Sequence, residues 1–231
     1  MSEYTGRTVL VTGTSGALGS GLAAAFADAG ARVIGVDRAA PDVRAHVDGV
    51  RYESADLTDD ARVGALFDAL LDGPLDGPGA PWAVINTVGG FAPHTPIASL
   101  DVDELTRQLT LNLVTAAVLT KHALRVMQPV GAGRIVHTAS RAATVPSGSG
   151  FAYSVSKLGV LRLVRMAAEE VAGSAITVNA VVPSIIDTPA NRAGMPDADH
   201  ASWPKIADLA RSYLYLASPR AALVNGAALP V

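Results

Sequence analysis

The sequence predicts a doubly wound α/β fold, with a mainly parallel sheet of about seven strands and helices on both faces. Short apolar runs alternate along the chain with longer segments of helical periodicity, which is typical of consecutive βαβ units. The apolar runs are continuous, as expected for strands that are buried on both faces. Hydrophobic residues make up 49% of the 231 residues and charged residues only 17%, a balance that a doubly covered sheet explains.

The elements follow from these two patterns in chain order. Each expected strand is short and bounded by turn residues; the strands are residues 8–12, 32–36, 83–86, 134–137, 176–182 and, more weakly, 227–231. Each expected helix repeats apolar residues at three- and four-residue spacing; the helices are residues 17–29, 59–71, 101–127, 151–171 and 203–217. Parallel strands joined in this way require right-handed crossovers.

A single domain over residues 1–231 accounts for the whole chain, since no repeat, charge block or low-complexity tail divides it. The Pro- and Gly-rich residues 72–81 are interpreted as a surface loop. Residues 188–204 break the alternation of strand and helix late in the chain. Because long loops often carry function, we expect this segment to cover the substrate as a lid.

A glycine-rich turn follows the first strand directly and opens the first helix. Glycines at such a turn bring backbone N–H groups against a pyrophosphate, and the helix N-terminus favours its charge. An ordinary strand-to-helix turn is the alternative, but the strand before, the helix after and the acidic Asp37 favour a dinucleotide and thus a Rossmann fold. The candidate residues of the turn are Gly13, Ser15, Gly16, Leu18 and Gly19.

Asp37 lies 18 residues after the last glycine, at the end of the second expected strand. A carboxylate there can hydrogen-bond the adenosine ribose hydroxyls and repels a 2′-phosphate. We therefore expect NAD(H) to be preferred, while the adjacent Arg38 could still allow NADP(H) to bind.

Tyr153 and Lys157 are four residues apart in an expected helix, so both side chains project from one helical face. A neighbouring ammonium favours the phenolate and would let Tyr153 exchange protons near neutral pH. A pair of surface residues is the alternative interpretation. Ser140 favours the functional one, since it ends a strand at the carboxyl edge of the sheet, 13 residues before Tyr153.

With these residues in place, the sequence resembles the short-chain dehydrogenase/reductase family of the single-domain type over essentially its full length. The resemblance implies an NAD(P)(H)-dependent oxidoreductase acting on a small carbonyl or alcohol. It implies that Ser140 holds the substrate oxygen, that Tyr153 transfers the proton, and that Lys157 lowers the pKa of Tyr153 and binds the nicotinamide ribose. Asn112, on the long middle helix, matches the position that supports this lysine through a water.

The same resemblance implies further cofactor contacts. It places Asp56 and Leu57 at the adenine, Asn86 and Gly89 near the ribose, and Pro183, Ile186 and Thr188 around the nicotinamide. Two features depart from the pattern. The glycine spacing is commoner in a longer branch of the family, and Ser184 stands where glycine usually follows the proline.

Some segments, residues 16–20, 89–91 and 187–203, are similar to quinonoid dihydropteridine reductases. Members of that group lack the residues that match Ser140 and Asn112, both of which are present here. The Ser140 hydroxyl, placed to hold a carbonyl oxygen, suits the reduction of a ketone better than that of a quinonoid ring. We therefore favour carbonyl reduction over pteridine reduction. An alternative of another class is a dinucleotide-sensing protein without catalysis, against which the complete set of catalytic residues argues.

The substrate side of the site offers weaker candidates. His94 follows the expected strand 83–86 and could line the pocket, although an exposed loop histidine is the alternative. Met195 and Trp203 could cap the substrate, or Trp203 could instead anchor the next helix to the core. The five histidines show no pair at metal-ligand spacing, so we expect no metal site.

Composition narrows the range of partners. The absence of cysteine excludes disulfides, thiolate metal sites and cysteine nucleophiles. A net charge of −3 offers no basic surface for nucleic acid or anionic lipid, and neither a signal peptide nor a membrane span is visible. We expect a cytoplasmic protein with a small-molecule substrate. Helices 101–127 and 151–171 carry more Ala, Val and Leu than one covered face needs, which predicts a homodimer or homotetramer.

Overall fold

A computed structural model describes residues 3–39, 46–72, 81–145 and 150–231 of the chain. Its strands form one parallel sheet with the order β3-β2-β1-β4-β5-β6-β7. The strands are β1 Thr8–Thr12, β2 Arg32–Asp37, β3 Val50–Ser54, β4 Ala83–Asn86, β5 Ala132–Thr138, β6 Ala175–Val182 and β7 Ala228–Pro230. The expected doubly wound α/β fold is confirmed.

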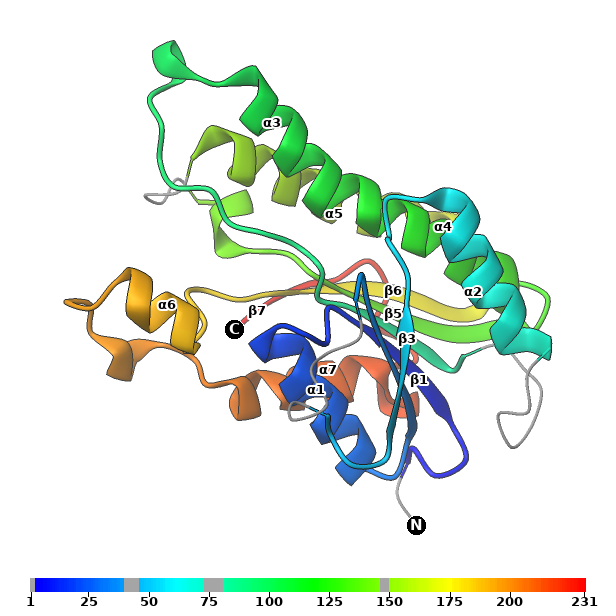
Figure 1. Ribbon diagram of the computed structural model, residues 1–231. Helices are drawn as coiled ribbons and strands as arrows, with labels where there is room; N and C mark the ends of the chain where they lie inside the picture. The colour runs from blue at the N-terminus through cyan, green and yellow to red at the C-terminus, as the bar shows by residue number, and fades with distance from the viewer. Residues whose placement is uncertain (1–2, 40–45, 73–80, 146–149) are drawn as a thin grey trace.

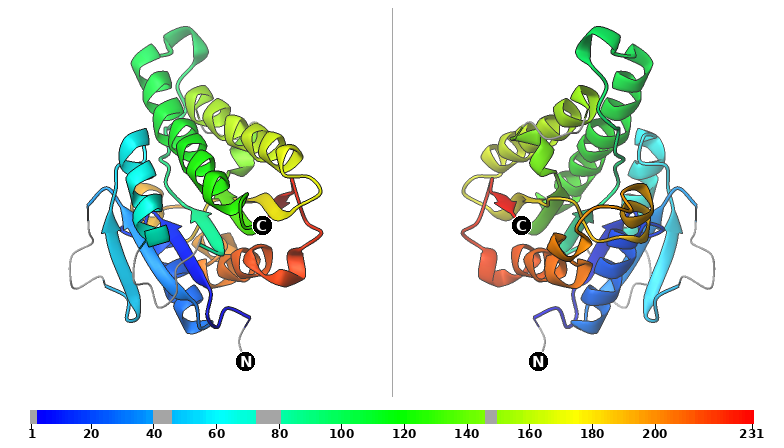
Figure 2. Two further views of the ribbon diagram at one scale, coloured as in Figure 1. Left: turned by 90° about the vertical axis from the view of Figure 1, so that its right-hand side faces the viewer. Right: turned by 90° about the vertical axis from the view of Figure 1, so that its left-hand side faces the viewer.

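Helices cover the sheet in two layers (Figure 1). They are α1 Ala17–Asp28, α2 Asp60–Asp72, α3 Val102–Gln108, α4 Thr115–Met127, α5 Phe151–Glu170, α6 Pro189–Gly194 and α7 Ile206–Ala217. The helices α1 and α7 pack on one face, while α2, α4 and α5 pack on the other. Figure 2 shows from two sides that α3 to α5 and α7 lie on opposite sides of the sheet.

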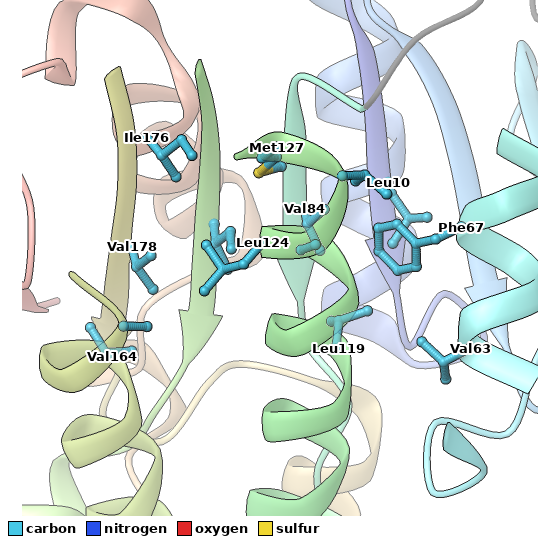
Figure 3. Close-up of a cluster of buried hydrophobic side chains, with 14 of the residues drawn as sticks. Leu10, Val63, Phe67, Val84, Leu119, Leu124, Met127, Val164, Ile176 and Val178 are labelled. Atoms are coloured by element: carbon cyan, nitrogen blue, oxygen red, sulfur yellow. The ribbon is translucent and has the colours of Figure 1, made fainter. Parts of the chain in front are cut away.

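The two hydrophobic cores explain why the strands are continuously apolar. Successive side chains of a strand point to opposite faces. Leu10 therefore joins the core beneath α2, α4 and α5, whereas its neighbours Val9 and Val11 join the core beneath α1 and α7. Figure 3 shows the first of these cores, with Leu10 and Val84 from the sheet facing Phe67 of α2 and Leu119 of α4.

The order of the strands reverses at β1, because the chain moves from β1 outward to β2 and β3 and then returns to place β4 on the other side. In open α/β sheets this reversal leaves a crevice at the carboxyl ends of the two central strands, where ligands bind. The glycine-rich turn after β1 and the loop after β4 both open into this crevice.

Two elements differ from the sequence expectation. The strand β3, with the sequence VRYES, was not among the apolar runs, because it lies at the sheet edge and is only partly buried. The expected helix over 101–127 is divided into α3, a π-helical segment Leu109–Val114 and α4. This insertion widens the helix at Asn112, and π segments of this kind are frequent at functional sites.

Other boundaries shift by a few residues, most clearly at α7, which begins at Ile206 instead of residue 203. Most of the loop expected over residues 72–81 falls outside the described residues. Within the described ranges, no helix is both long and apolar enough to cross a bilayer.

Candidate active site

The turn after β1 has the backbone that its glycines predict. Gly13 has a φ of +78°, a left-handed conformation that side chains disfavour, and its carbonyl oxygen accepts a hydrogen bond from Gly16 N at 3.0 Å. A Cβ atom on Gly19 would lie 2.1 Å from that same oxygen, so only glycine fits there. No side chain caps the start of α1, which leaves the first N–H groups of the helix available to an anion.

A cleft of about 720 Å³ extends from this turn along the carboxyl ends of β1 to β4. Most of the residues expected to bind the dinucleotide line it: Gly13, Ser15, Gly16, Leu18, Gly19, Asp37, Arg38, Asp56, Leu57, Gly89 and Thr188. Its lining also contains residues that sequence reasoning did not single out, among them Thr87, Leu111 and Thr115. The other expected cofactor-binding residues are not part of the lining: Asn86, Tyr153, Lys157, Pro183 and Ile186.

The two acidic residues of the cleft are held by backbone groups. Asp37 accepts hydrogen bonds from Ser15 N at 2.9 Å and from Arg38 N at 2.7 Å, which fixes its carboxylate beside the glycine turn. Asp56 accepts from the Thr58 hydroxyl at 2.7 Å and from Thr58 N at 2.9 Å. These two hydrogen bonds lower the pKa of Asp56, so it remains a carboxylate at neutral pH.

Asn86 lies beneath the cleft in a buried polar network, where it supports the cleft without lining it. Its Oδ1 accepts from the Thr12 hydroxyl at 2.8 Å and from Val88 N at 3.1 Å, while its Nδ2 lies 3.2 Å from His137 Nδ1. The Asn86 side chain thereby holds the loop after β4 against β1. The placement of Asn86 near the ribose, which the resemblance implies, stays a prediction.

His137 completes this network as a neutral side chain. Its Nε2 lies 2.9 Å from the Thr120 hydroxyl, which donates its own proton to Ala116 O at 2.7 Å. The hydroxyl must therefore accept from Nε2–H, and Nδ1 is left as the acceptor for Asn86 Nδ2. Complete burial, and secondarily the charge of Lys157, lower the pKa of His137 to about 4.

Ser140 and Tyr153 meet at the end of β5. The phenol of Tyr153 hydrogen-bonds with the Ser140 hydroxyl, which also accepts from Ala142 N at 3.2 Å. Burial raises the pKa of Tyr153, and the hydrogen bond from Ser140 opposes this effect. That Lys157 lowers the pKa of Tyr153, as the resemblance implies, stays a prediction.

Lys157 is nearly buried behind this pair. Its Nζ donates to Thr138 O at 2.9 Å, and burial lowers its pKa to about 8. The close approach of Asn112 and Lys157 to the loop after β4 requires glycine at position 89, since a Cβ atom there would lie 2.6 Å from Asn112 Oδ1 and 2.9 Å from Lys157 Nζ. The loop after β4, the π segment and α5 therefore converge at Gly89.

Asn112 is positioned by backbone contacts to the same loop. Its Oδ1 accepts from Gly90 N at 3.0 Å, and its Nδ2 donates to Gly90 O at 3.1 Å and to Gln108 Oε1 at 2.8 Å. Ser156 Oγ lies 3.1 Å from the same nitrogen and donates to Tyr153 O. Sequence reasoning missed Gln108 and Ser156. Gln108 lies one helical turn, four residues, before Asn112, and Ser156 directly precedes Lys157, so their positions next to candidate residues were the available signal.

On the substrate side, an aromatic residue that was not a candidate packs against Tyr153. The ring of Phe91 meets the Tyr153 ring edge-on at 5.3 Å and is still 62% exposed. His94 is exposed in the same loop. Trp203 is buried, and its ring packs at a tilt of 49° against the His200 ring with the centroids 4.6 Å apart, which favours the anchoring interpretation. Neither Trp203 nor Met195 lines the cleft.

The segment 188–204 is held in a defined conformation beside the cleft. Thr188 caps α6 by accepting from Asn191 N at 3.2 Å, and Arg192 pairs with Asp187 at 2.5 Å. His200 Nε2 lies 2.7 Å from Met195 O. Among the described residues there is no cluster of three or more His, Asp or Glu side chains that could bind a metal ion.

Comparisons with known proteins agree with this geometry. Residues 7–198 match the family model described as short chain dehydrogenase. The chain is 35% identical to cis-4-hydroxycyclohexanecarboxylate dehydrogenase of Sinomonas cyclohexanicum, covering 97% of this chain and 94% of the relative. It is 31% identical to the mitochondrial borneol dehydrogenase of Lavandula x intermedia, covering 96% and 87%.

Solved structures show the same similarity. The fold superposes on an NAD(P)-dependent protein from Beutenbergia cavernae with a TM-score of 0.83 at 27% identity, covering 98% of this chain and 95% of that one. That structure carries NADP at low occupancy.

Proposed function

The chain belongs to the short-chain dehydrogenase/reductase family and is an oxidoreductase, and we propose that it interconverts a small alicyclic secondary alcohol and its ketone. The observation that carries this proposal is the hydrogen-bonded pair of Ser140 and Tyr153 together with the buried ammonium of Lys157, which lies close to Gly89 in the lining of the cleft. The names of two relatives, which denote hydroxylated ring compounds, support the substrate class.

The cleft fits a nicotinamide dinucleotide. The close packing of Gly19 on Gly13 and the uncapped start of α1 form a cradle for a pyrophosphate, which a Cβ atom at Gly19 would fill. Asp37, held by Ser15 N, is placed to accept hydrogen bonds from an adenosine ribose. When bound there, the nicotinamide supplies or accepts the hydride.

We propose that NAD(H) is preferred over NADP(H). A 2′-phosphate near Asp37 would bring two negative charges together, and Arg38 opposes this repulsion only in part. The side chain of Asp37 is already oriented by two backbone N–H groups, so its carboxylate cannot turn away without losing both hydrogen bonds.

In this mechanism Tyr153 exchanges the proton of the substrate oxygen. In the reductive direction the phenol donates its proton to that oxygen as negative charge develops, while the Ser140 hydroxyl holds the oxygen in place. The Lys157 ammonium stabilises the phenolate that remains. Its position depends on Gly89 and on the amide of Asn112, which pins the loop at Gly90.

The other activities considered are not favoured. The relatives described above carry names of alcohol dehydrogenases, and neither is named as a dihydropteridine reductase or a sensor protein. Residues 188–204 are proposed to form the substrate lid, since Thr188, Pro189 and Ala190 line the cleft next to the glycine turn. Met195 is the member of this segment proposed to contact the substrate, and His94 the corresponding residue of the loop after β4.

We also propose that the protein forms a homodimer or homotetramer. Large apolar side chains are exposed on α5 and on the π segment: Leu158 at 50%, Met166 at 51% and Val114 at 41%. Exposed apolar residues on adjacent helices are expected to be covered by another copy, because their exposure to water is unfavourable.

The proposed function is tested by NAD⁺-dependent oxidation of cyclohexanol and borneol. Tyr153→Phe should lower kcat by about 100-fold or more, since general acid–base catalysis contributes about 10²- to 10⁴-fold. The affinity for NADH, measured by fluorescence titration, should change little. Tyr215→Phe, on the exposed side of α7, is the matched control and should retain activity. Equal turnover by the two variants would rule out the proposed role of Tyr153.

A further inference from the structure

A buried phenol on α7 is not used by the proposed mechanism. Tyr213 is fully buried in the core beneath α1 and α7, among apolar side chains such as Leu209. Burial raises the pKa of Tyr213, so its phenol stays protonated at neutral pH. A hydroxyl group buried in this way requires a hydrogen-bond partner, because an unsatisfied polar group in an apolar core is unfavourable.

The partner of this phenol is Thr138, the last residue of β5. Tyr213 Oη lies 2.7 Å from Thr138 Oγ1, and Thr138 Oγ1 lies 2.8 Å from Asn86 O. A carbonyl oxygen only accepts hydrogen bonds, so the Thr138 hydroxyl donates its proton to Asn86 O and accepts from the phenol of Tyr213. The side chain of Thr138 is therefore fixed from two directions, by α7 and by the end of β4.

The main-chain carbonyl of the same threonine holds the buried lysine of the site. Lys157 Nζ donates to Thr138 O at 2.9 Å. β4 ends at Asn86, which is paired with His137, so β5 extends past β4 at Thr138. Within the described residues no carboxylate forms an ion pair with Lys157. The position of its ammonium therefore depends on how firmly the Thr138 carbonyl is held.

We propose that Tyr213 is a positioning residue of the active site, which fixes the carbonyl of Thr138 and thereby the ammonium of Lys157. The link passes through the sheet, since α7 packs on one face and α5, which carries Lys157, packs on the other (Figure 2). This inference rests on the proposed function, in which the ammonium stabilises the phenolate of Tyr153. Displacement of such a group lowers the rate, because catalysis requires close alignment of the groups involved.

The titratable neighbours of Lys157 determine what a pH profile reports. They are His137 on β5, with which Lys157 interacts electrostatically, and Tyr153, one helical turn earlier on α5. The pKa of His137 is about 4, so this side chain is neutral throughout the neutral and alkaline range. Changes of the pH profile in that range therefore arise from Tyr153 and Lys157.

The first experiment measures NAD⁺-dependent oxidation of cyclohexanol from neutral to alkaline pH. Tyr213→Phe removes the hydroxyl and keeps the ring, so the core stays filled. It should lower kcat by about three- to tenfold and raise the apparent pKa of kcat/KM, because a displaced ammonium stabilises the Tyr153 phenolate less.

Two changes at the threonine test the link itself. Thr138→Val removes the hydroxyl that receives the phenol proton and should raise the same apparent pKa, whereas Thr138→Ser keeps the hydroxyl and should retain the wild-type profile. The double variant with Tyr213→Phe should lose no more activity than Thr138→Val alone, because both changes break one link. Additive losses in the double variant would overturn the proposal.

Tyr4→Phe is the matched control. Tyr4 is buried in the same core, and its phenol also donates to α7, at Leu214 O. The substitution should lower stability in urea as Tyr213→Phe does, since it also removes a buried hydrogen bond, but it should retain the wild-type pH profile. A wild-type profile for Tyr213→Phe as well would overturn the proposal, although the oxidoreductase function would stand.

A measurement on Lys157 itself separates this inference from the proposed chemistry. Competitive labelling with acetic anhydride, followed by mass spectrometry, reports the pKa of each lysine, and Lys121 and Lys205 serve as internal references. Burial lowers the pKa of Lys157 to about 8, and this pKa should fall further in Tyr213→Phe, because the hydrogen bond to Thr138 O favours the charged form. This shift would support the positioning role even if no tested alcohol were oxidised, whereas an unchanged pKa of Lys157 would overturn it.

Discussion

The buried histidine beneath the cleft leads to a quantitative prediction about stability. His137 is fully buried and neutral, and its pKa of about 4 lies below its ordinary value of 6.5. Between these two values the unfolded chain binds a proton at His137 and the folded protein does not. The free energy of unfolding must therefore decrease as the pH falls through this range, and the full stability is present only above the unfolded pKa.

The size of the effect follows from the two pKa values. With an unfolded pKa of about 6.5, lowering the pH from about 7.5 to about 5 removes about 2 kcal/mol of stability through His137 alone. The substitution His137→Asn removes the titrating group while keeping a side chain that can donate and accept hydrogen bonds toward Asn86 and Thr120. It should abolish this contribution.

The assay is urea denaturation followed by circular dichroism at both pH values. The loss of stability on acidification should be smaller by about 2 kcal/mol in His137→Asn than in the wild-type protein. His94→Asn replaces an exposed histidine and should retain the wild-type pH dependence. If His137→Asn lost as much stability as the wild type, within about 0.5 kcal/mol, the assignment of a buried neutral histidine would be refuted.

Three further predictions concern the cleft and the outer helices. Gly89→Ala places a methyl group 2.6 Å from Asn112 Oδ1 and 2.9 Å from Lys157 Nζ, so kcat/KM should fall by about tenfold or more, and unaltered steady-state kinetics would show that the loop yields without consequence. Asp37→Ala should raise the ratio of kcat/KM for NADPH to that for NADH by about tenfold, since it removes a charge repulsion; an unchanged ratio would exclude Asp37 as the selector. Leu158→Glu should lower the sedimentation mass toward that of a monomer, and a mass equal to that of the wild-type oligomer would place the interface elsewhere.

Local patterns in the chain explain which parts of the site could be predicted. The glycine turn needs only a strand before it and a helix after it, and Tyr153 and Lys157 need only a spacing of four residues in a helix. Their placement at one sheet edge then follows from the parallel arrangement of the strands. The edge strand β3 escaped notice because its partly exposed residues do not form an apolar run.

The supporting contacts depend on residues that are distant in sequence. Asn86 and His137 are opposite each other in the register of β4 and β5, and nothing in either segment by itself indicates that their side chains bond. Likewise, Asn112 of the π segment is joined to Gly90 of the loop after β4 through a pair of hydrogen bonds. Apolar periodicity alone therefore predicts one continuous helix over residues 101–127, whereas the structure contains the wider π segment within it.

The sequence by itself determined the alternation of strands and helices, the doubly covered sheet and the residues at the ends of its strands, because these depend on periodicity and on neighbours along the chain. Only the tertiary structure decided which of those residues line the cleft and which support it from below. Burial and charge pairing result from the packing of distant segments, and so they are properties of the folded molecule that no local pattern contains.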